Sequence, residues 1–470
     1  MSMKKINLLL LLLVLTNSTL FASIRLPNIL GSHMVLQQKS KVKIWGWGAP
    51  EETVTIKTNW DTITYKAQTN NGAKWITEIQ TPAAGGPYQI TIQASNQIVL
   101  DDILIGEVWL CSGQSNMEWS GDQKLQQSIN EAPNANNKNI RFFYVPKATA
   151  HYPQENTAGH WVVCSPEEML HFSAIGYFFG KILTNSLNSP IGLINSNWGG
   201  TPAETWTPNY IIEQSTALSD AAKKQNSTPW WSPRVADTYN AMIAPLTNFN
   251  IAGTIWYQGE SNTDTYYGYE ELFTKMMGAW RAAWNKDFPF YFVQIAPFSY
   301  GRQHVGALLR EAQTKASLYP NTGMVVISDL VSDTNNIHPT LKVEVAERLA
   351  NLALNKHYGF NNMNALSPSF ASYSIEKDKI IIQLEHAENG LKINGEVATC
   401  FEIAGDDKQF LPAVVKLNGN KLIVSNKLIQ KPIAVRFGFK NTAIPNLFSK
   451  EGLPVNLFRT DNWEVSTNPK

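Results

Sequence analysis

The sequence predicts a central α/β domain with a largely parallel sheet, flanked on each side by a β-rich domain. Two observations support this fold class. In the middle of the chain, strand-like runs that are apolar throughout alternate with amphipathic helical stretches, as in a parallel sheet covered by helices on both faces. Before and after it, short runs alternate apolar with polar residues, and Gly, Pro, Asn and Asp separate them. The 470 residues suffice for about three domains of about 150 residues each.

Residues 1–23 have the three parts of an export signal. Two lysines form a basic start, an unbroken apolar run extends from Leu8 to Leu15, and small residues surround Ala22. The apolar run is shorter than the roughly 20 residues that a membrane-spanning helix needs. We therefore expect cleavage near Ala22, with a retained anchor as the weaker alternative. The mature protein is expected to be exported, either periplasmic or secreted to the cell surface, without stable membrane insertion.

The two flanking domains, residues 24–102 and 359–470, are predicted to be β-sandwiches. In the first, the strand-like runs are Lys41–Gly46, Thr53–Lys57, Thr62–Ala67, Lys74–Ile79 and Tyr88–Gln93. In the second, they are Lys379–Leu384, Lys392–Ile393, Ala413–Leu417, Lys421–Val424 and Ala434–Phe437.

The central domain, residues 103–358, carries the buried strands. Helical spacing of apolar residues predicts helices over 167–187 and 341–354. In folds of this kind, functional groups gather at the carboxyl ends of the strands, so polar motifs that follow different strands are expected to meet. The predicted strands are Ile105–Cys111, Ile191–Asn195, Ala252–Tyr257, Phe288–Ile295 and Met324–Ser328.

Composition excludes some classes of function. The formal net charge is +1 and no long charge run occurs, which argues against a nucleic-acid-binding protein. The three cysteines, Cys111, Cys164 and Cys400, do not make a disulfide scaffold or a zinc signature, although one pair could form in an oxidising compartment. The 15 Trp and 16 Tyr either fill β-rich cores or, in part, line a sugar-binding cleft.

Two polar motifs follow the first two buried strands. Gly113 permits a sharp bend, and Ser115 lies two residues further on. A serine hydroxyl is a weak nucleophile unless a base removes its proton. Gly199 and Gly200 follow the second strand, where glycine lets a backbone N–H approach a ligand and stabilise an oxyanion.

The third motif, residues 256–262, follows the next strand. Gln258 and Asn262 are candidate side-chain donors to an oxyanion, and Glu260 is a candidate substrate contact. Ser261 is a rival nucleophile with less support.

The fourth motif follows the last strand and contains Asp333 and His338. A histidine on this loop could reach the carboxyl edge of the sheet and act as a general base, with His304 as its best rival. Together the four motifs supply a hydroxyl, oxyanion donors and a base, the groups that acyl transfer requires.

These motifs together resemble the sialate O-acetylesterase family of the SGNH hydrolases. The resemblance rests on Gly113-Gln-Ser-Asn-Met117, Trp256-Tyr-Gln-Gly-Glu-Ser-Asn262 and Asn336-Ile-His-Pro339. Supporting stretches are Met34-Val-Leu-Gln37, Leu309-Arg-Glu-Ala-Gln313, and Glu451-Gly-Leu-Pro454 followed by Phe458-Arg-Thr-Asp-Asn-Trp463, so the resemblance covers nearly the whole mature chain.

The resemblance implies a flavodoxin-like three-layer SGNH hydrolase domain between the β-domains. It also implies hydrolysis of acetyl esters on sugars, with O-acetylated sialic acids as the leading substrate and without a metal or other cofactor. Ser115 matches the nucleophile, His338 the base, and Gly200 a backbone oxyanion donor. Gln258 is the first candidate for a side-chain donor and Asn262 the second.

One position departs from the pattern of many SGNH enzymes, which place an aspartate three residues before the histidine. Here that position is Asn335, and the nearest upstream acid is Asp333. Either Asp333 orients His338 from a longer loop, or the enzyme works with a Ser-His dyad in which a backbone carbonyl orients the ring.

Two alternatives remain at this point. The substrate could be acetylated xylan or another glycan, since Arg234, Arg281 and Arg302, the candidate cations for a sialic acid carboxylate, cannot be placed from sequence. Alternatively, the chain could be an exported carbohydrate-binding protein, which fits the β-domains and the tryptophans but leaves the four polar motifs unexplained.

Overall fold

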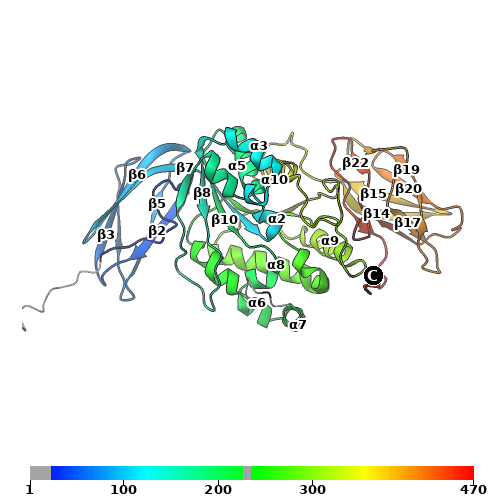
Figure 1. Cartoon of the computed structure of the whole chain (residues 1–470), viewed down its shortest axis with the longest axis horizontal. Helices are drawn as coiled ribbons and strands as arrows, with labels where there is room; N and C mark the ends of the chain where they lie inside the picture. Colours follow the sequence, from blue (N-terminus) through cyan, green and yellow to red (C-terminus); the bar gives the residue numbers. More distant parts are fainter. Residues whose placement is uncertain (1–22, 226–227, 229–233, 470) are drawn as a thin grey trace, which may run out of the picture.

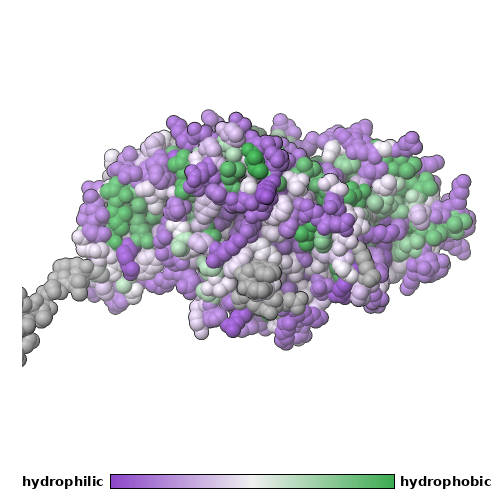
Figure 2. Space-filling model, in the orientation of Figure 1, coloured by the Kyte–Doolittle hydropathy of each residue, from purple (hydrophilic) through white to green (hydrophobic). Residues whose placement is uncertain are grey.

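The computed structural model describes residues 23–225, 228 and 234–469, so nearly all of the predicted signal segment lies outside the described residues. The molecule is elongated (Figure 1). Strands of the N-terminal part lie at one end, parallel strands and long helices lie in the middle, and the C-terminal sheets lie at the other end. Figure 2 shows mostly hydrophilic side chains over the middle of this face, and hydrophobic patches over both ends.

The central sheet confirms the α/β class. Its strands lie in the order β13-β12-β11-β7-β10-β8-β9, and all are parallel except β9, which runs antiparallel to β8. The strands are β7 (Gln97–Gly113), β8 (Asn137–Tyr144), β9 (Trp161–Cys164), β10 (Ile191–Asn197), β11 (Gly253–Tyr257), β12 (Phe290–Val293) and β13 (Thr322–Val325). Five of them match the predicted runs. β8 and β9 were not predicted, because Lys138 and Arg141 interrupt the apolar pattern of β8.

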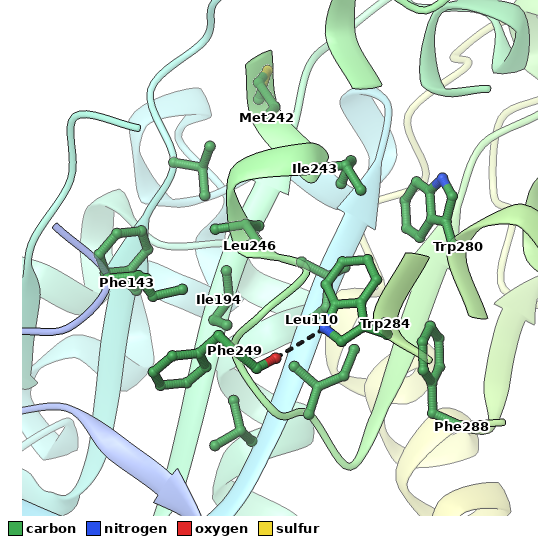
Figure 3. Close-up of a cluster of buried hydrophobic side chains, with 14 of the residues drawn as sticks. Leu110, Phe143, Ile194, Met242, Ile243, Leu246, Phe249, Trp280, Trp284 and Phe288 are labelled. Atoms are coloured by element: carbon green, nitrogen blue, oxygen red, sulfur yellow. Dashed lines mark hydrogen bonds between the residues drawn. The ribbon is translucent and has the colours of Figure 1, made fainter. Parts of the chain in front are cut away.

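Helices cover both faces of this sheet. Along β7, Val108 and Leu110 belong to one hydrophobic cluster, and Trp109 and Cys111 belong to the other. The first cluster includes α8 (Tyr266–Trp284) and α9 (Val305–Ala316), and the second includes α5 (Ala174–Leu187) and α10 (Lys342–Lys356). Figure 3 shows the α8 side, where the indole nitrogen of Trp284 donates to the carbonyl oxygen of Phe249 at 2.9 Å.

The helix predicted over 167–187 is two helices. α4 (Pro166–His171) ends before Phe172, and α5 begins after Ser173, whose side chain accepts a hydrogen bond from the N–H of Gly176. The Ser173 hydroxyl also donates to the carbonyl oxygen of Met117 at 2.6 Å. The serine side chain accepts a hydrogen bond from a backbone N–H at the start of α5, so a new helix begins there. The spacing of apolar residues alone predicts one continuous helix.

The remaining helical elements are short. The α-helices are α2 (Ser115–Glu118), α3 (Gln126–Glu131), α6 (Asn209–Glu213) and α7 (Thr216–Ala222). The 3-10 and π elements are η1 (Gly121–Gln123), η2 (Ala132–Asn134), η3 (Ala203–Trp206), η4 (Tyr239–Ile243), η5 (Ala244–Leu246) and η6 (Glu260–Thr265).

The N-terminal strands are continuous with the central sheet. β7 pairs with β6 and β1 through its first half and with β10 and β11 through its second half, so one strand crosses the boundary predicted at 102–103. β3, β4 and β6 extend this sheet, and the β2–β5 pair packs its apolar side chains into the same cluster. The strands are β1 (Val35–Gln37), β2 (Lys41–Trp47), β3 (Thr53–Thr58), β4 (Thr64–Gln68), β5 (Lys74–Gln80) and β6 (Gly85–Gln93).

The C-terminal part contains two four-stranded sheets that share one core. The orders are β14-β15-β20-β19 and β18-β17-β21-β23, and β16 pairs with β22. Arg459 makes a two-point ion pair with Glu311 of α9, at 2.7 and 2.9 Å, which attaches this part to the central part. The strands are β14 (Ser369–Glu376), β15 (Lys379–Glu385), β16 (Leu391–Ile393), β17 (Phe401–Ala404), β18 (Leu411–Pro412), β19 (Val414–Asn418), β20 (Lys421–Ser425), β21 (Ala434–Phe437), β22 (Leu447–Ser449) and β23 (Phe458–Arg459).

All three cysteines are free thiols, so none of the pairings that the composition left open is formed. Within the described ranges, no helix is both long and apolar enough to cross a bilayer.

Candidate active site

The ends of three neighbouring strands bring the first three motifs together. Gly113 of β7 is the register partner of Asn197 in β10 and of Tyr257 in β11. The chain bends at Gly113, whose φ is +139°. A Cβ at this position would lie 2.2 Å from the carbonyl oxygen of Tyr257, so only glycine allows this close approach.

Ser115 and His338 are in direct contact. Ser115 begins α2, and its Oγ lies 2.8 Å from Nε2 of His338. The His338 ring stacks on Trp119, with ring centroids 4.5 Å apart and planes inclined by 23°. Burial, together with the Lys342 ammonium, lowers the pKa of His338 to about 4. The imidazole is therefore neutral at neutral pH and can accept the serine proton.

The Gly199–Gly200 turn lies against the serine. A Cβ on Gly199 would lie 3.3 Å from Cβ of Ser115, and the Gly199 N–H donates to Glu118 Oε2 at 2.6 Å. Gly200 has φ +77°, a conformation that favours glycine. Within the part of the chain that the structure describes, the N–H groups of Ser115 and Gly200 have no hydrogen-bond acceptor. Both remain available as donors to a ligand.

Gln258 and Asn262 are committed to a buried network. Gln258 Nε2 donates to the Thr201 carbonyl at 3.2 Å and to Asn262 Oδ1 at 2.7 Å. Asn262 Nδ2 donates to Glu204 Oε2 at 2.8 Å and to Thr265 Oγ1 at 3.3 Å. The prediction that either amide has an N–H free for an oxyanion is therefore wrong. The two amides instead join the second motif to the third.

Glu260 is also buried, and its contact with substrate stays a prediction. Its Oε1 accepts from Asn116 Nδ2 at 2.6 Å, and the same Nδ2 donates to the carbonyl oxygen of Ile337 at 3.0 Å. Asn116 Oδ1 accepts from the Lys342 ammonium at 2.6 Å. Desolvation raises the pKa of Glu260 and lowers that of Lys342 to about 7. Asn116, the residue after Ser115, is thus bonded to Ile337, the residue before His338.

The structure does not bring Asp333 to His338. The Asp333 carboxylate is exposed and accepts from the N–H of Asn335 at 2.8 Å. Among the described residues it makes no hydrogen bond with the His338 ring, so the predicted triad is not formed. Asn336 is the loop side chain that holds the histidine, because its Oδ1 accepts from the His338 N–H at 2.9 Å.

The rival groups have other partners. The Ser261 hydroxyl donates to the carbonyl oxygen of Gly200 at 2.9 Å, and His304 Nδ1 lies 3.0 Å from the carbonyl oxygen of Ser466. The candidate cations for a carboxylate are likewise engaged: Arg281 with the carbonyl oxygens of Phe288, Pro320 and Asn321, Arg302 with Asp264, and Arg234 with His151.

Comparison with known proteins identifies the chain. A family model described as a carbohydrate esterase, sialic acid-specific acetylesterase, matches residues 105–355, more than half of the chain. The chain belongs to the sialic acid-specific acetylesterase family of carbohydrate esterases. It is an esterase, a carboxylic ester hydrolase, and the family supports O-acetylesterase activity on carbohydrates.

Relatives match this esterase over most of its length. The sialate O-acetylesterase of Rattus norvegicus is 30% identical over 428 residues, covering 77% of this chain and 79% of the relative. That of Homo sapiens is 29% identical over 425 residues, covering 81% and 80%. A crystal structure of a carbohydrate acetylesterase from Xanthomonas citri has a TM-score of 0.85 and 33% identity, covering 94% of this chain and 100% of that one.

Several residues of the esterase site were not predicted from sequence. Asn116, Glu118 and Trp119 lie within the motif of Ser115, so their closeness to the serine in sequence could have indicated a place in the site. Lys342 carried no signal, because a single lysine at the start of a helix is ordinarily exposed. Among the described residues, no group of three or more His, Cys, Asp or Glu is placed to hold a metal ion.

Proposed function

We propose that this esterase removes O-acetyl groups from carbohydrates through an acetyl-serine intermediate, with Ser115 as nucleophile and His338 as general base. The observation that carries the proposal is the 2.8 Å contact between Ser115 Oγ and His338 Nε2, beside the backbone N–H groups of Ser115 and Gly200, which have no acceptor among the residues that the structure describes. Serine esterases need this combination of a hydroxyl, a neutral base and oxyanion donors.

The steps follow from these groups. His338 takes the Ser115 proton while Oγ attacks the acetyl carbonyl, and the N–H groups of Ser115 and Gly200 hold the oxyanion. The sugar alkoxide leaves with the proton from His338, so the acetyl group is bonded to Ser115. Water then loses a proton to His338 and attacks the acetyl-serine, which releases acetate and restores the hydroxyl. Each oxyanion donor typically lowers the barrier by about 3 kcal/mol.

The leading substrate is an O-acetylated sialic acid, because relatives that match over most of the chain are named sialate O-acetylesterases. An acetylated neutral glycan, such as xylan, is the alternative. It is favoured by the engagement of Arg234, Arg281 and Arg302 with protein partners, which leaves none of the three predicted cations unpaired for a carboxylate.

Two broader assignments belong to the same proposal. The sheet covered by helices on both faces supports a flavodoxin-like three-layer SGNH hydrolase domain, and the paired sheets at each end support flanking β-sandwich domains. The basic and apolar segment over 1–23 supports export to the periplasm or the cell surface.

The decisive experiment compares p-nitrophenyl acetate hydrolysis by the wild type, Ser115→Ala and Ser261→Ala, with a chelator present. Ser115→Ala is expected to lose at least about 10³-fold in kcat/KM, in the range of triad-member removal, while its thermal unfolding is unchanged. Ser261→Ala serves as the matched control and is expected to keep activity within a few fold. Activity retained by Ser115→Ala would refute the serine assignment.

A further inference from the structure

We infer that a pocket between the β2–β5 strand pair and the segment before β11 is a second carbohydrate site, one that binds neutral oligosaccharides and is separate from the Ser115 site. Its volume is about 400 Å³, within the usual range of small-ligand sites. Its lining includes Trp45 and Trp47, of which Trp47 is the more exposed. The inference does not rest on the proposed serine mechanism.

The aromatic wall is a product of strand register. Trp45 pairs with Ile76 and Trp47 with Lys74 across the two antiparallel strands. Paired residues project to the same face of a sheet, so these four side chains form one surface. Ile76 is 51% exposed, which leaves aliphatic surface beside the indoles that the fold itself does not bury. The apolar C–H face of a sugar ring packs on a surface of this kind.

The pocket carries no unpaired charge. The Lys74 ammonium forms an ion pair with Glu155, and the Trp47 indole nitrogen donates to the other carboxylate oxygen of Glu155 at 3.2 Å. A charged ligand would gain no ion pair here without breaking this one. A neutral ligand is therefore favoured over an acidic sugar.

Side-chain amides supply the polar contacts. Asn248 Oδ1 accepts from Lys43 Nζ at 3.3 Å, and Asn70 Oδ1 accepts from the N–H groups of Gly72 and Lys74. Considering only the described ranges, neither asparagine uses its NH₂ group as a donor. Two free amide donors beside an aromatic wall match the hydroxyl groups and apolar face of a sugar.

The pocket lies at the opposite edge of the sheet from Ser115. Residues 244–248 precede β11, whereas the polar motifs follow the carboxyl ends of β7, β10 and β11. The five residues of β11, at about 3.3 Å each, separate the two edges by roughly 16 Å. A polymeric glycan held here would be retained by the enzyme without occupying the ester-cleaving site.

The test is isothermal titration of the full chain with xylohexaose, a neutral β-linked oligosaccharide, and with sialyllactose as the acidic comparison. We expect saturable binding of xylohexaose that is equal in wild type and Ser115→Ala, and at least fivefold weaker in Trp47→Ala. Asn248→Ala, which removes one of the two amide donors, is expected to weaken binding in the same direction. Trp60→Ala is the matched control, because this partly buried tryptophan of the same region packs on Tyr88 outside the pocket.

Thermal unfolding and p-nitrophenyl acetate hydrolysis are measured for each variant, so that misfolding and loss of the serine chemistry are each distinguished from loss of sugar binding. The inference is overturned if xylohexaose does not bind saturably, or if Trp47→Ala and Asn248→Ala bind it as wild type does. Loss of binding in Ser115→Ala would place the sugar in the ester-cleaving site and overturn it as well. Tighter binding of sialyllactose, sensitive to Trp47→Ala, would overturn the assignment to neutral sugars.

Discussion

At the scale of single residues, the environment of His338 makes a prediction about pH. Its pKa is lowered to about 4 by burial and by Lys342, so the base stays neutral down to acidic pH. We expect the acid limb of kcat/KM for p-nitrophenyl acetate to lie near pH 4. A limb near the ordinary histidine value of about 6.5 would contradict this environment.

The lowered pKa of His338 also affects the free energy of unfolding. Between pH 6.5 and about 4 the unfolded chain protonates this histidine while the native chain does not, so His338 makes the folded state less stable as the pH falls through that window.

The contacts of the loop that carries His338 favour a Ser-His dyad over a triad. Among the described residues, the Asp333 carboxylate bonds to the N–H of Asn335 and not to the His338 ring, and Asn336 holds the histidine backbone, so we expect Asp333→Ala to lose less than about fivefold in kcat. Asn336→Ala, its neighbour, is expected to lose more. Steady-state kinetics of the two variants decide the question. A loss of about 10⁴-fold in Asp333→Ala, the size seen when a triad aspartate is replaced, would show that the loop rearranges to a triad.

Asn116 is the positioning residue with the largest expected effect. Removing its amide leaves Glu260 and Lys342 buried without their shared partner and frees the Ile337 carbonyl, at about 1–3 kcal/mol for each unsatisfied group. Asn116→Ala should lower both the melting temperature and kcat. Its pH profile should also change, because the Lys342 charge that acts on His338 is no longer held. A variant with wild-type kcat and pH profile would remove Asn116 from this role.

At the scale of elements, the bend at the end of β7 limits which residue can stand two positions before the serine. Gly113→Ala would place a Cβ 2.2 Å from a neighbouring carbonyl oxygen at a positive φ, and we expect a loss above about 4 kcal/mol or failure to fold. Gly419→Ala, at φ +62° with nothing within 4 Å, isolates the conformational cost of about 1 kcal/mol. Equal melting temperatures for the two variants would contradict the steric argument.

Sequence patterns predicted the elements whose burial is uniform and missed those whose pattern is mixed. The runs of β7, β10 and β11 were found because they are apolar throughout, whereas β8 was hidden by Lys138 and Arg141. The positions of Ser115 and His338 followed from strand ends and topology. The role of Gln258 could not be predicted, since an amide becomes an oxyanion donor or a structural clamp according to which acceptors the fold places beside it.

At the scale of the whole molecule, the supporting stretches of the sequence hold parts of the fold together. Gln313 donates to the carbonyl oxygen of Gln258 and accepts from the N–H of Ile295, so it fixes the third motif. Two positions before it, Glu311 pairs with Arg459 of the C-terminal part.

A double-mutant cycle of Glu311→Gln and Arg459→Met should show this attachment. Both side chains are mostly buried and paired at two points, so we expect a coupling of about 1–3 kcal/mol in thermal unfolding. Strict additivity of the two changes would mean that the pair contributes nothing to the attachment. Lys421→Gln paired with Glu311→Gln provides a distant control that should be additive.

The continuous strand β7 has a consequence for anyone who wishes to shorten this enzyme. Its first half pairs with β6, its residues 104–106 pair with β1, and its last residue precedes the turn that presents Ser115. A fragment beginning at residue 103 would start inside that strand. It would expose backbone hydrogen-bonding groups that β6 and β1 otherwise pair, and an exposed sheet edge promotes aggregation. A shortened esterase should therefore retain the N-terminal strands. A fusion to another domain at this junction would break the hydrogen bonds between paired strands, because no flexible linker lies there.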